Sequence, residues 1–482
     1  MRRWWPLVAI CLGTFMLLVD VTIVNVALPA MAGSLESSFA GLQWVIDGYA
    51  LALAALLMVT GSLADRFGRR RLYLVGLGVF AAASLACGLA PTAGALVAAR
   101  VVQGAGGAAM FATTAALVAI TYHGRDRGTA FGVWGAVNGL AAACGPLVGG
   151  VLTEVWGWRA IFLVNLPVAA LAVALTLAVV ARDVRVDGAT RIDLAGAAAF
   201  TAASTALVYG LIEAGAVGWS AVGTVVPLVA AAVALAVFVA VERRVAHPVL
   251  DLALFRNRSF AALMVAAAVL SGAAFAHLAL VSLWLQEVLR LSPIRAGLAV
   301  VPLSIASFVV SAAAGRLLHG GSPARPVAGG LALIGFGVLL LGVVDAGSGP
   351  WALAPGLVVC GLGVGLATPV LVSATLAVLP PAKAGVGSAA VNTFRQLGLA
   401  VGLAVLGTVF AGYANPTDPG APGYTDGLDA VFLTAGVAAL AAAVLVVVLV
   451  RRPTSEPAAV ASAAPGPAAP TEPAERRAPS VG

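Results

Sequence analysis

The sequence predicts an all-α protein that crosses a membrane many times, and three observations lead to this fold class. Of its 482 residues, 61% are apolar and only 10% are charged, whereas an ordinary soluble domain carries roughly 25% charged residues. A membrane-spanning helix needs about 20 apolar residues, and runs of that length follow one another along nearly the whole chain. Arginines collect in alternate gaps between these runs. Together these features exclude a soluble enzyme with one anchor, a disordered chain and a fibrous chain.

Each long apolar run is expected to be a helix, because an isolated strand in lipid would leave its backbone N–H and C=O groups without partners. We predict fourteen spans, at 6–28, 42–63, 72–90, 95–117, 129–152, 160–181, 193–213, 220–241, 260–285, 296–317, 327–345, 351–376, 386–412 and 428–450.

The basic residues predict the orientation of the chain in the membrane. If the first residues are cytoplasmic, nearly all arginines and Lys383 fall on the cytoplasmic side, and only Arg159, Arg290 and Arg295 fall on the other. This bias predicts that both termini are inside. The net charge of +7 therefore reflects membrane topology, and we expect no nucleic-acid partner. The preference for arginine over lysine suggests a bacterium with GC-rich DNA, and hence its inner (plasma) membrane.

Two charged linkers, 182–192 and 242–259, enclose the seventh and eighth spans. We therefore expect four regions along the chain. They are an N-terminal six-helix bundle (1–181), linkers with an inserted helix pair (182–259), a C-terminal six-helix bundle (260–452) and a disordered cytoplasmic tail rich in Pro and Ala (453–482).

Enzymatic chemistry is not indicated. A nucleotide-binding P-loop needs Gly-Lys-Ser/Thr, and the single lysine, Lys383, stands in Pro-Pro-Ala-Lys-Ala. The four cysteines lie in separate apolar runs, which favours small buried side chains over disulfides or a metal site. The sequence contains no evident nucleophile–base pair or metal-ligand cluster. We expect no cofactor and no metal.

Three charged residues stand out inside predicted spans, namely Asp20, Asp47 and Arg100. A charge near the membrane centre costs about 2.5–3.5 kcal/mol on insertion scales. With a rise of about 1.5 Å per residue, all three lie roughly 8–12 Å from the outer end of their helices. An acid paired with Arg100 would reduce this cost. One interpretation is a fixed ion pair that sets helix packing. The other is a proton-coupling site, in which Arg100 changes the proton affinity of Asp20 and Asp47 as it moves.

Further polar residues within the spans are candidates for a substrate cavity. Asn392, Arg395 and Gln396 are spaced i, i+3, i+4 and share one helix face. Interhelical hydrogen bonding is the alternative for each amide alone, but Arg395 needs a partner or water. Gln103 shares a helix face with Arg100, and the remaining candidates are single residues, namely Asn25, Asn138 and His277.

The loop that follows the second span combines glycines, one acid and several arginines. Its candidate gating residues are Gly61, Asp65, Arg66, Gly68, Arg69 and Arg70. The glycines allow a tight turn, and the acid suits either a helix N-terminus or an arginine partner. The simpler alternative is a basic cluster that only holds the loop on the cytoplasmic side.

At these residues the sequence resembles the major facilitator superfamily, in its fourteen-helix drug:proton antiporter group. The similarity covers both halves of the chain. Its motifs are the loop Gly61–Arg71, the first-span segment Leu18–Pro29, Arg100-Val-Val-Gln103-Gly104 in the fourth span, Gly145-Pro146-Leu-Val-Gly149-Gly150 in the fifth, Trp158–Pro167, and Asn392-Thr-Phe-Arg395-Gln396-Leu-Gly398.

The resemblance implies two six-helix bundles around a central cavity and proton-driven export of amphipathic compounds by alternating access. It implies that Arg100 takes part in proton coupling and that Asp65 belongs to a cytoplasmic gate. It also implies that Gly145, Pro146, Gly149 and Gly150 pack against the facing bundle. The corresponding second-half loop, 315–321, departs from the motif, so a symmetric gate is not expected.

We therefore expect a proton-coupled multidrug or antibiotic efflux transporter. Its partners would be the lipid bilayer, protons and a small amphipathic substrate, and it would act as a monomer. Two alternatives stay open. One is an exporter of an endogenous metabolite or peptide, and the other is a membrane sensor that transports nothing.

Overall fold

The computed structural model describes residues 2–35, 39–182, 193–245, 248–317, 323–343, 347–380, 383–413 and 423–450. Every regular element within these ranges is helical. The tail predicted to be disordered, 453–482, lies outside them.

The first six predicted spans correspond to seven helices, because the sixth is broken at Val164. Gly68 and Gly157 adopt φ values of 99° and 80°, which suit glycine because it lacks a Cβ atom; each lies between two consecutive helices. A short 3₁₀ helix, η1, covers Arg2–Trp4. The helices are α1 (Trp5–Leu35), α2 (Phe39–Phe67), α3 (Arg69–Gly88), α4 (Ala93–Thr121), α5 (Gly124–Trp156), α6 (Ala160–Leu163) and α7 (Asn165–Val179).

The inserted pair and the second half follow the same pattern. The predicted span 260–285 consists of α10, α11 and a π-helical segment, η3, in direct succession. The elements are α8 (Leu194–Val217), α9 (Val222–Glu242), η2 (Leu252–Arg256), α10 (Arg258–Phe275), α11 (His277–Leu283), η3 (Trp284–Val288), α12 (Pro293–Leu317), α13 (Ala324–Leu340), η4 (Leu341–Val343), η5 (Pro350–Leu353), α14 (Ala354–Ala377), α15 (Ala384–Ala411) and α16 (Tyr424–Leu449).

Each of the fourteen predicted ranges therefore coincides with a helix or an interrupted helix. Among the described residues, thirteen helices are long and apolar enough to cross a membrane. The remaining predicted span lies in α5, a helix of 33 residues in which the stretch Leu147–Trp156 is recognised as apolar. The chain is an all-helical, multi-pass membrane protein.

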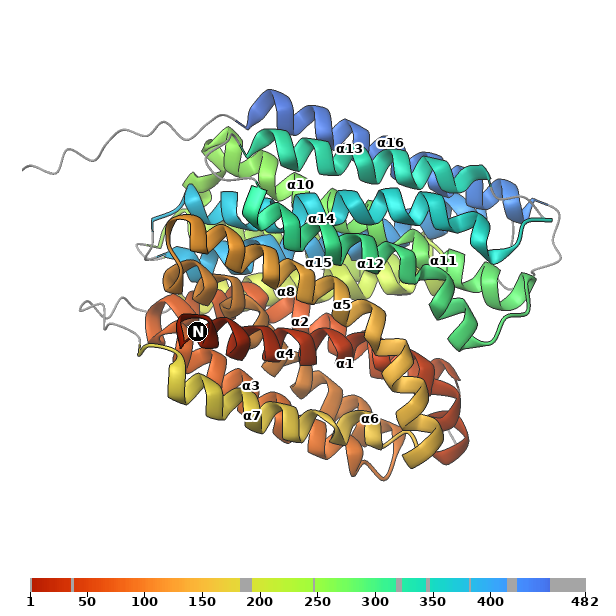
Figure 1. Cartoon of the computed structure of the whole chain (residues 1–482), viewed down its shortest axis with the longest axis horizontal. Coiled ribbons are helices and arrows are strands. Elements are labelled where there is room, and N and C mark those ends of the chain that lie inside the picture. Colours follow the sequence, from red (N-terminus) through yellow and green to blue (C-terminus); the bar gives the residue numbers. More distant parts are fainter. Residues whose placement is uncertain are drawn as a thin grey trace, which may run out of the picture. The chain divides into compact units, whose positions relative to one another are not determined.

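Two groups of helices lie side by side within Met1–Arg451 (Figure 1), α1 to α7 in one and α10 to α16 in the other. They contact each other mainly where α5 packs on α12 and where α2 packs on α15. Glycines allow close helix approach within each group. An added Cβ at Gly106 would lie 2.7 Å from the backbone of Phe80, and one at Gly330 would lie 2.7 Å from the carbonyl of Gly363.

Helices α8 and α9 pack chiefly on each other, and α8 also packs on α2 and α15. The rings of Trp44 on α2 and Tyr209 on α8 stack with their centroids 5.7 Å apart. The outer face of α9 exposes Val226, Val229 and Val233, as expected for a helix that faces lipid. The division of the chain into two bundles and an inserted pair stays a prediction.

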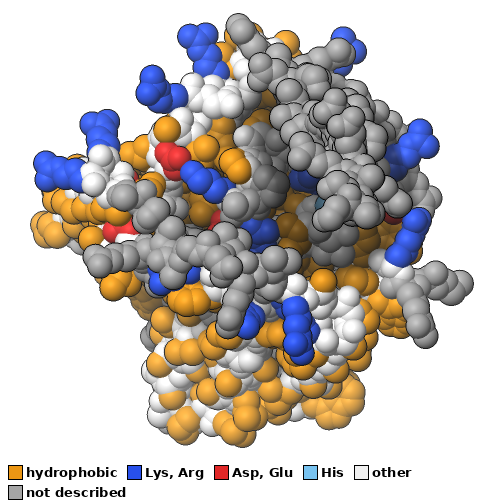
Figure 2. All heavy atoms as spheres, turned by 90° about the vertical axis from the view of Figure 1, so that its left-hand side faces the viewer, with side chains coloured by type: hydrophobic (Ala, Val, Ile, Leu, Met, Phe, Trp, Pro, Cys, Tyr) orange, Lys and Arg blue, Asp and Glu red, His pale blue; other side chains and the backbone are white. Residues whose placement is uncertain are grey.

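Positive side chains gather at one end of the helices. Figure 2 shows this end, which carries many Lys and Arg side chains around its rim. We call it the arginine-rich end; Arg69 and Arg70 begin α3 there, Arg125 lies in the first turn of α5, and Arg243 and Arg244 follow the end of α9. At this end Lys383, just before α15, donates to Asp251 at 2.9 Å.

Candidate functional site

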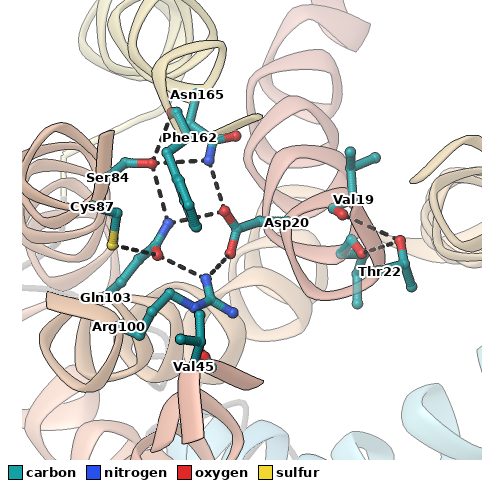
Figure 3. A network of polar contacts seen from close by, with 11 residues as sticks. Val19, Asp20, Thr22, Val45, Ser84, Cys87, Arg100, Gln103, Phe162 and Asn165 are labelled. Carbon is teal, nitrogen blue, oxygen red and sulfur yellow. Dashed lines mark hydrogen bonds and ion pairs between the residues drawn. The ribbon is translucent and has the colours of Figure 1, made fainter. Parts of the chain in front are cut away.

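Five polar side chains form a buried cluster among α1, α3, α4 and α7 (Figure 3). Asp20 comes from α1, Ser84 from α3, Arg100 and Gln103 from α4, and Asn165 from the start of α7. None of them is more than 3% exposed. Such side chains are costly inside a membrane protein unless they satisfy one another, and here they do.

Asp20 receives donors on both carboxylate oxygens. Arg100 donates from Nη1 to Oδ2 at 2.5 Å. Oδ1 accepts from the amide of Gln103 at 3.0 Å and from that of Asn165 at 2.8 Å. Both amides also donate to the hydroxyl of Ser84, which in turn donates to the carbonyl of Phe162. Three donors from three side chains thus converge on one carboxyl group.

Arg100 is held by more than its counter-ion. Nη1 also donates to Oε1 of Gln103 at 2.7 Å, and Nε donates to the carbonyl of Val45 at 3.0 Å. The guanidinium carbon lies 4.0 Å from the centre of the Tyr49 ring, within the range of a cation–π interaction. If Asp20 became protonated, Arg100 would therefore keep hydrogen-bond acceptors on α4 and α2.

The chemistry available to this cluster is reversible protonation. Asp20 is 0% exposed, so in this arrangement its carboxylate is separated from water on every side. Proton exchange with either side of the membrane requires the surrounding helices to move.

Asp47 lies outside this cluster. It stands on α2, is half-buried, and has neither a hydrogen bond nor an ion pair with any described residue. The predicted pairing of an acid with Arg100 is therefore seen for Asp20, and the structure does not bring Asp47 to the guanidinium.

Sequence reasoning did not select Ser84, Asn165 or Tyr49 as site residues. Asn165 could have been selected from the sequence, because it is an amide within Trp158–Pro167, one of the segments that carry the family resemblance. Nothing in the sequence marks Ser84 or Tyr49 as a site residue. Ser84 is a single serine in an apolar helix and Tyr49 lies near a helix end, and such residues usually serve packing.

Asp65 connects the end of α2 to the start of α15 at the arginine-rich end. Its Oδ1 accepts from the backbone N–H of Gly385 at 2.7 Å, and its Oδ2 accepts from that of Val386 at 2.8 Å. Arg69 donates to the same carboxylate at 2.8 Å. A carboxylate on the first amides of a helix satisfies N–H groups that have no partner within it and interacts favourably with its dipole.

Gly61, one turn earlier on α2, lies directly against α15, where an added Cβ would overlap that of Ala389. We call Gly61, Asp65, Gly385 and Val386 the α2–α15 contact. Arg70 binds elsewhere, donating to the carbonyls of Thr176 and Leu177 on α7. Gly68 provides the turn into α3, and the Arg66 guanidinium lies 5.4 Å from the Phe67 ring centre.

The Asp65→Asn variant is expected to transport at least about tenfold more slowly. An amide presents one acceptor oxygen in place of two charged ones, and a hydrogen bond to a charged group contributes about 1.5–3 kcal/mol. The α2–α15 contact would then open more often. Rates in reconstituted vesicles, with spin-label distances between α2 and α15, check this. An unchanged rate and distance would show that the contact has no gating role.

The glycines of the fifth span differ in part from the expectation. Gly145 and Gly149 pack on α1 of the same helix group, where an added Cβ would overlap Thr22 or Ile23. Gly150 faces the other group, with its added Cβ 3.5 Å from Ile294 of α12. The side chain of Pro146 lies outside the described residues.

Gly135 and Gly139, earlier in α5, make the closer approach to the other group. An added Cβ at Gly139 would lie 3.3 Å from the backbone of α12. The motif glycines are therefore placed mainly for packing within their own helix group.

The other cavity candidates are dispersed. Asn138 donates to the carbonyl of Trp134 in its own helix at 2.6 Å. His277 is fully buried, with Nδ1 2.9 Å from the carbonyl of Ala273 and its ring edge-on to Phe432. The side chain of Asn25 lies outside the described residues.

Asn392, Arg395 and Gln396 do share one stretch of α15, as their spacing predicts. Asn392 reaches the other helix group, donating to the carbonyl of Phe111 on α4 at 3.3 Å. Arg395 donates to the hydroxyl of Ser271 on α10 at 3.3 Å. Gln396 is half-buried.

The described part of the chain has thirteen apolar helices long enough to cross a membrane, and four of its helices enclose a buried carboxylate–guanidinium pair, as in a polytopic membrane protein with a polar site inside its helix bundle. Residues 10–403 match the family described as Major Facilitator Superfamily. The chain belongs to this superfamily, which consists of transporters rather than enzymes.

Several relatives are resistance proteins. The chain is 39% identical over 412 residues to multidrug resistance protein Stp of Mycobacterium tuberculosis, covering 85% of this chain and 76% of the relative. It is 33% identical to the methylenomycin A resistance protein of Streptomyces coelicolor, covering 94% of each. It is 37% identical to the puromycin resistance protein pur8 of Streptomyces alboniger, covering 85% of this chain and 82% of the relative.

A solved structure shares the fold. The human organic anion transporter MFSD10 matches 92% of this chain and 99% of its own with a TM-score of 0.67. At 17% identity, this likeness concerns the fold alone.

Proposed function

We propose that the protein exports amphipathic drugs or antibiotics in exchange for protons, by alternating access. The observation that carries this proposal is the sealed pair of Asp20 and Arg100, with its 2.5 Å contact. Gln103 and Asn165 also donate to the carboxylate, so that helices α4 and α7 both hold it in the paired arrangement. The resistance functions in the names of its relatives support drugs or antibiotics as cargo.

In the proposed cycle, a rearrangement of α1 against α4 separates Asp20 from Arg100 and exposes the carboxyl group to the outer side. Without its counter-ion, the carboxylate gains proton affinity and takes up a proton. Return to the paired arrangement on the inner side expels that proton, because Arg100 again stabilises the charged form. One proton thus enters for each turn of the cycle through Asp20.

The α2–α15 contact supplies the barrier on the arginine-rich side. Asp65 joins two helices from different groups through backbone amides, so this end opens only when that carboxylate leaves the start of α15. We assign this end to the cytoplasm, because arginine-rich loops stay inside. Both termini are then cytoplasmic, and the membrane is the bacterial inner membrane.

The proton gradient supplies enough energy for export. Each proton that moves inward contributes about 2.3 kcal/mol per 100 mV of membrane potential. Each unit of pH difference adds about 1.36 kcal/mol. A combined gradient of about 3–4 kcal/mol supports a drug gradient of two to three orders of magnitude at one proton per drug.

The test is a resistance panel in an efflux-deficient bacterial host that expresses the intact gene, followed by uptake into everted membrane vesicles. The panel includes puromycin and methylenomycin A, which two relatives name, and peptides and metabolites for the alternative cargo. We expect resistance to at least one antibiotic and uptake that stops when an ionophore collapses the pH gradient. Uptake that ignores the gradient would exclude proton coupling.

Asp47→Asn is expected to reduce gradient-driven uptake only partially, by about tenfold or less. Asp47 is half-buried and unpaired among the described residues. It would therefore assist proton entry without forming an ion pair with Arg100. Initial uptake rates in everted vesicles, compared with those of Asp20→Asn, provide the measurement. Equal and complete loss in both variants would make Asp47 an obligatory proton carrier.

A further inference from the structure

Arg395 is a membrane-embedded arginine without a counter-ion among the described residues. Its Nη1 is buried and has no hydrogen-bond partner. Its one hydrogen bond in the described part of the chain is the 3.3 Å contact from Nε to Ser271, at the long end of the usual range. The side chain as a whole is half-buried, so part of it remains accessible.

Comparison with Arg100 shows which partners Arg395 lacks among the described residues. Both are arginines on membrane-spanning helices, but Arg100 has the carboxylate of Asp20, two further acceptors and an aromatic ring. A guanidinium cannot lose its proton in a protein, so Arg395 keeps its charge. An uncompensated charge in a low-dielectric interior is strongly unfavourable. An arginine kept in this state is ready to bind an anion that arrives with a ligand.

The position of Arg395 suits a ligand that moves between the helix groups. Helix α15 packs on α10 within its own group and on α2 and α4 of the other. Counted outward from the arginine-rich end, the α2–α15 contact comes first, at Gly385 and Val386, and the Asn392–Phe111 hydrogen bond follows. Arg395 is three residues further along α15, or about 4.5 Å at 1.5 Å per residue. It thus lies on the outer side of the Asn392–Phe111 contact between the groups.

We propose that Arg395 and Ser271 form a binding site for an anionic group, a carboxylate or sulfonate, on the exported compound. A guanidinium matches the two oxygens of such a group with parallel N–H donors. Ser271 accepts from Nε of Arg395, and its own hydroxyl hydrogen remains for the anion. The inference rests on the proposed export function and narrows its substrates to amphipathic compounds that carry a negative charge.

The test uses two fluorescent dyes with one aromatic skeleton. 1-Anilinonaphthalene-8-sulfonate carries a sulfonate, and N-phenyl-1-naphthylamine is the same molecule without it. Equilibrium dialysis against the full chain in nanodiscs, corrected with empty nanodiscs, gives both affinities. The variants are Arg395→Gln, Arg395→Lys, which keeps the charge, and Arg295→Gln, an exposed control.

We expect Arg395→Gln to weaken sulfonate-dye binding at least about tenfold and to leave the uncharged dye within about twofold. Arg395→Lys should weaken it less, and Arg295→Gln should change neither dye. The proposal is overturned if wild type and Arg395→Gln bind the sulfonate dye equally well, or if neither binds it. It is also overturned if Arg395→Gln loses affinity for both dyes to the same extent.

Uptake in everted vesicles separates this proposal from the export function. Gradient-driven uptake of the uncharged dye, with sulfonate binding independent of Arg395, would leave export standing and remove the anion site. Sulfonate binding that depends on Arg395, without uptake of any compound, would support the anion site and contradict the export function.

Discussion

Asp20→Asn is expected to abolish gradient-driven drug uptake, with a loss of at least about 100-fold, and to leave downhill drug movement intact. Asparagine imitates the protonated carboxyl group, which the proposed cycle forms while Asp20 is separated from Arg100. It cannot release a proton, so the imposed pH gradient no longer does work on the drug. The measurement is uptake by everted vesicles with and without a pH gradient.

Downhill exchange in the same vesicles serves as the folding control. A folded Asp20→Asn protein equilibrates labelled drug across the membrane, because the helices still alternate between arrangements. Asp47→Asn is the matched acid outside the cluster. Normal gradient-driven uptake by Asp20→Asn would remove Asp20 from the mechanism.

Arg100→Ala is expected to lower the free energy of unfolding by about 3–5 kcal/mol, because it leaves the buried Asp20 carboxylate without a counter-ion. The donors from Gln103 and Asn165 stay, but neither carries a charge. Unfolding of the purified protein by sodium dodecyl sulfate in mixed micelles measures the loss. Arg290→Ala is the surface control. Its side chain is 76% exposed, and it should change stability by less than about 1 kcal/mol.

A double-mutant cycle isolates the pair. Asp20→Asn combined with Arg100→Ala removes both charges, so the double variant should be more stable than Arg100→Ala alone. The two changes should therefore be non-additive by about 1–3 kcal/mol. Additive losses would mean that the two side chains do not stabilise each other in the folded protein.

The sequence alone predicted the helices well, because the physical constraint is strong. Lipid requires every spanning segment to satisfy its own backbone, so each apolar run of sufficient length could only be a helix. The estimated depths of Asp20 and Arg100 also placed them at one level, and the ion pair confirms that expectation.

The sequence could not fix how each helix is rotated. In α1 apolar residues occur on every face, so the pattern does not reveal which side meets α4. For this reason Asp47 and Asp20 looked equivalent, although only Asp20 faces the guanidinium. The family resemblance implied that Gly145 and Gly149 pack on the facing helix group, and the sequence pattern could not correct this; they pack on Thr22 and Ile23.

Contacts between residues far apart in sequence were equally hidden. Asp65 was expected to act at a helix end or with an arginine, and it does both. The helix end that it caps, however, is that of α15, where the Gly385 N–H donor lies 320 residues further along the chain. A carboxylate can satisfy any exposed helix N-terminus, and the chain offers many, so composition could not choose among them.

The most direct test of the proton role of Asp20 is the proton movement itself. Purified protein is reconstituted into vesicles that contain a pH-sensitive dye, and an antibiotic from the resistance panel is added on one side. We predict drug-dependent proton flux with wild-type protein and none with Asp20→Asn. Equal drug-dependent proton flux in both proteins would show that the proton travels elsewhere and would contradict the mechanism proposed here.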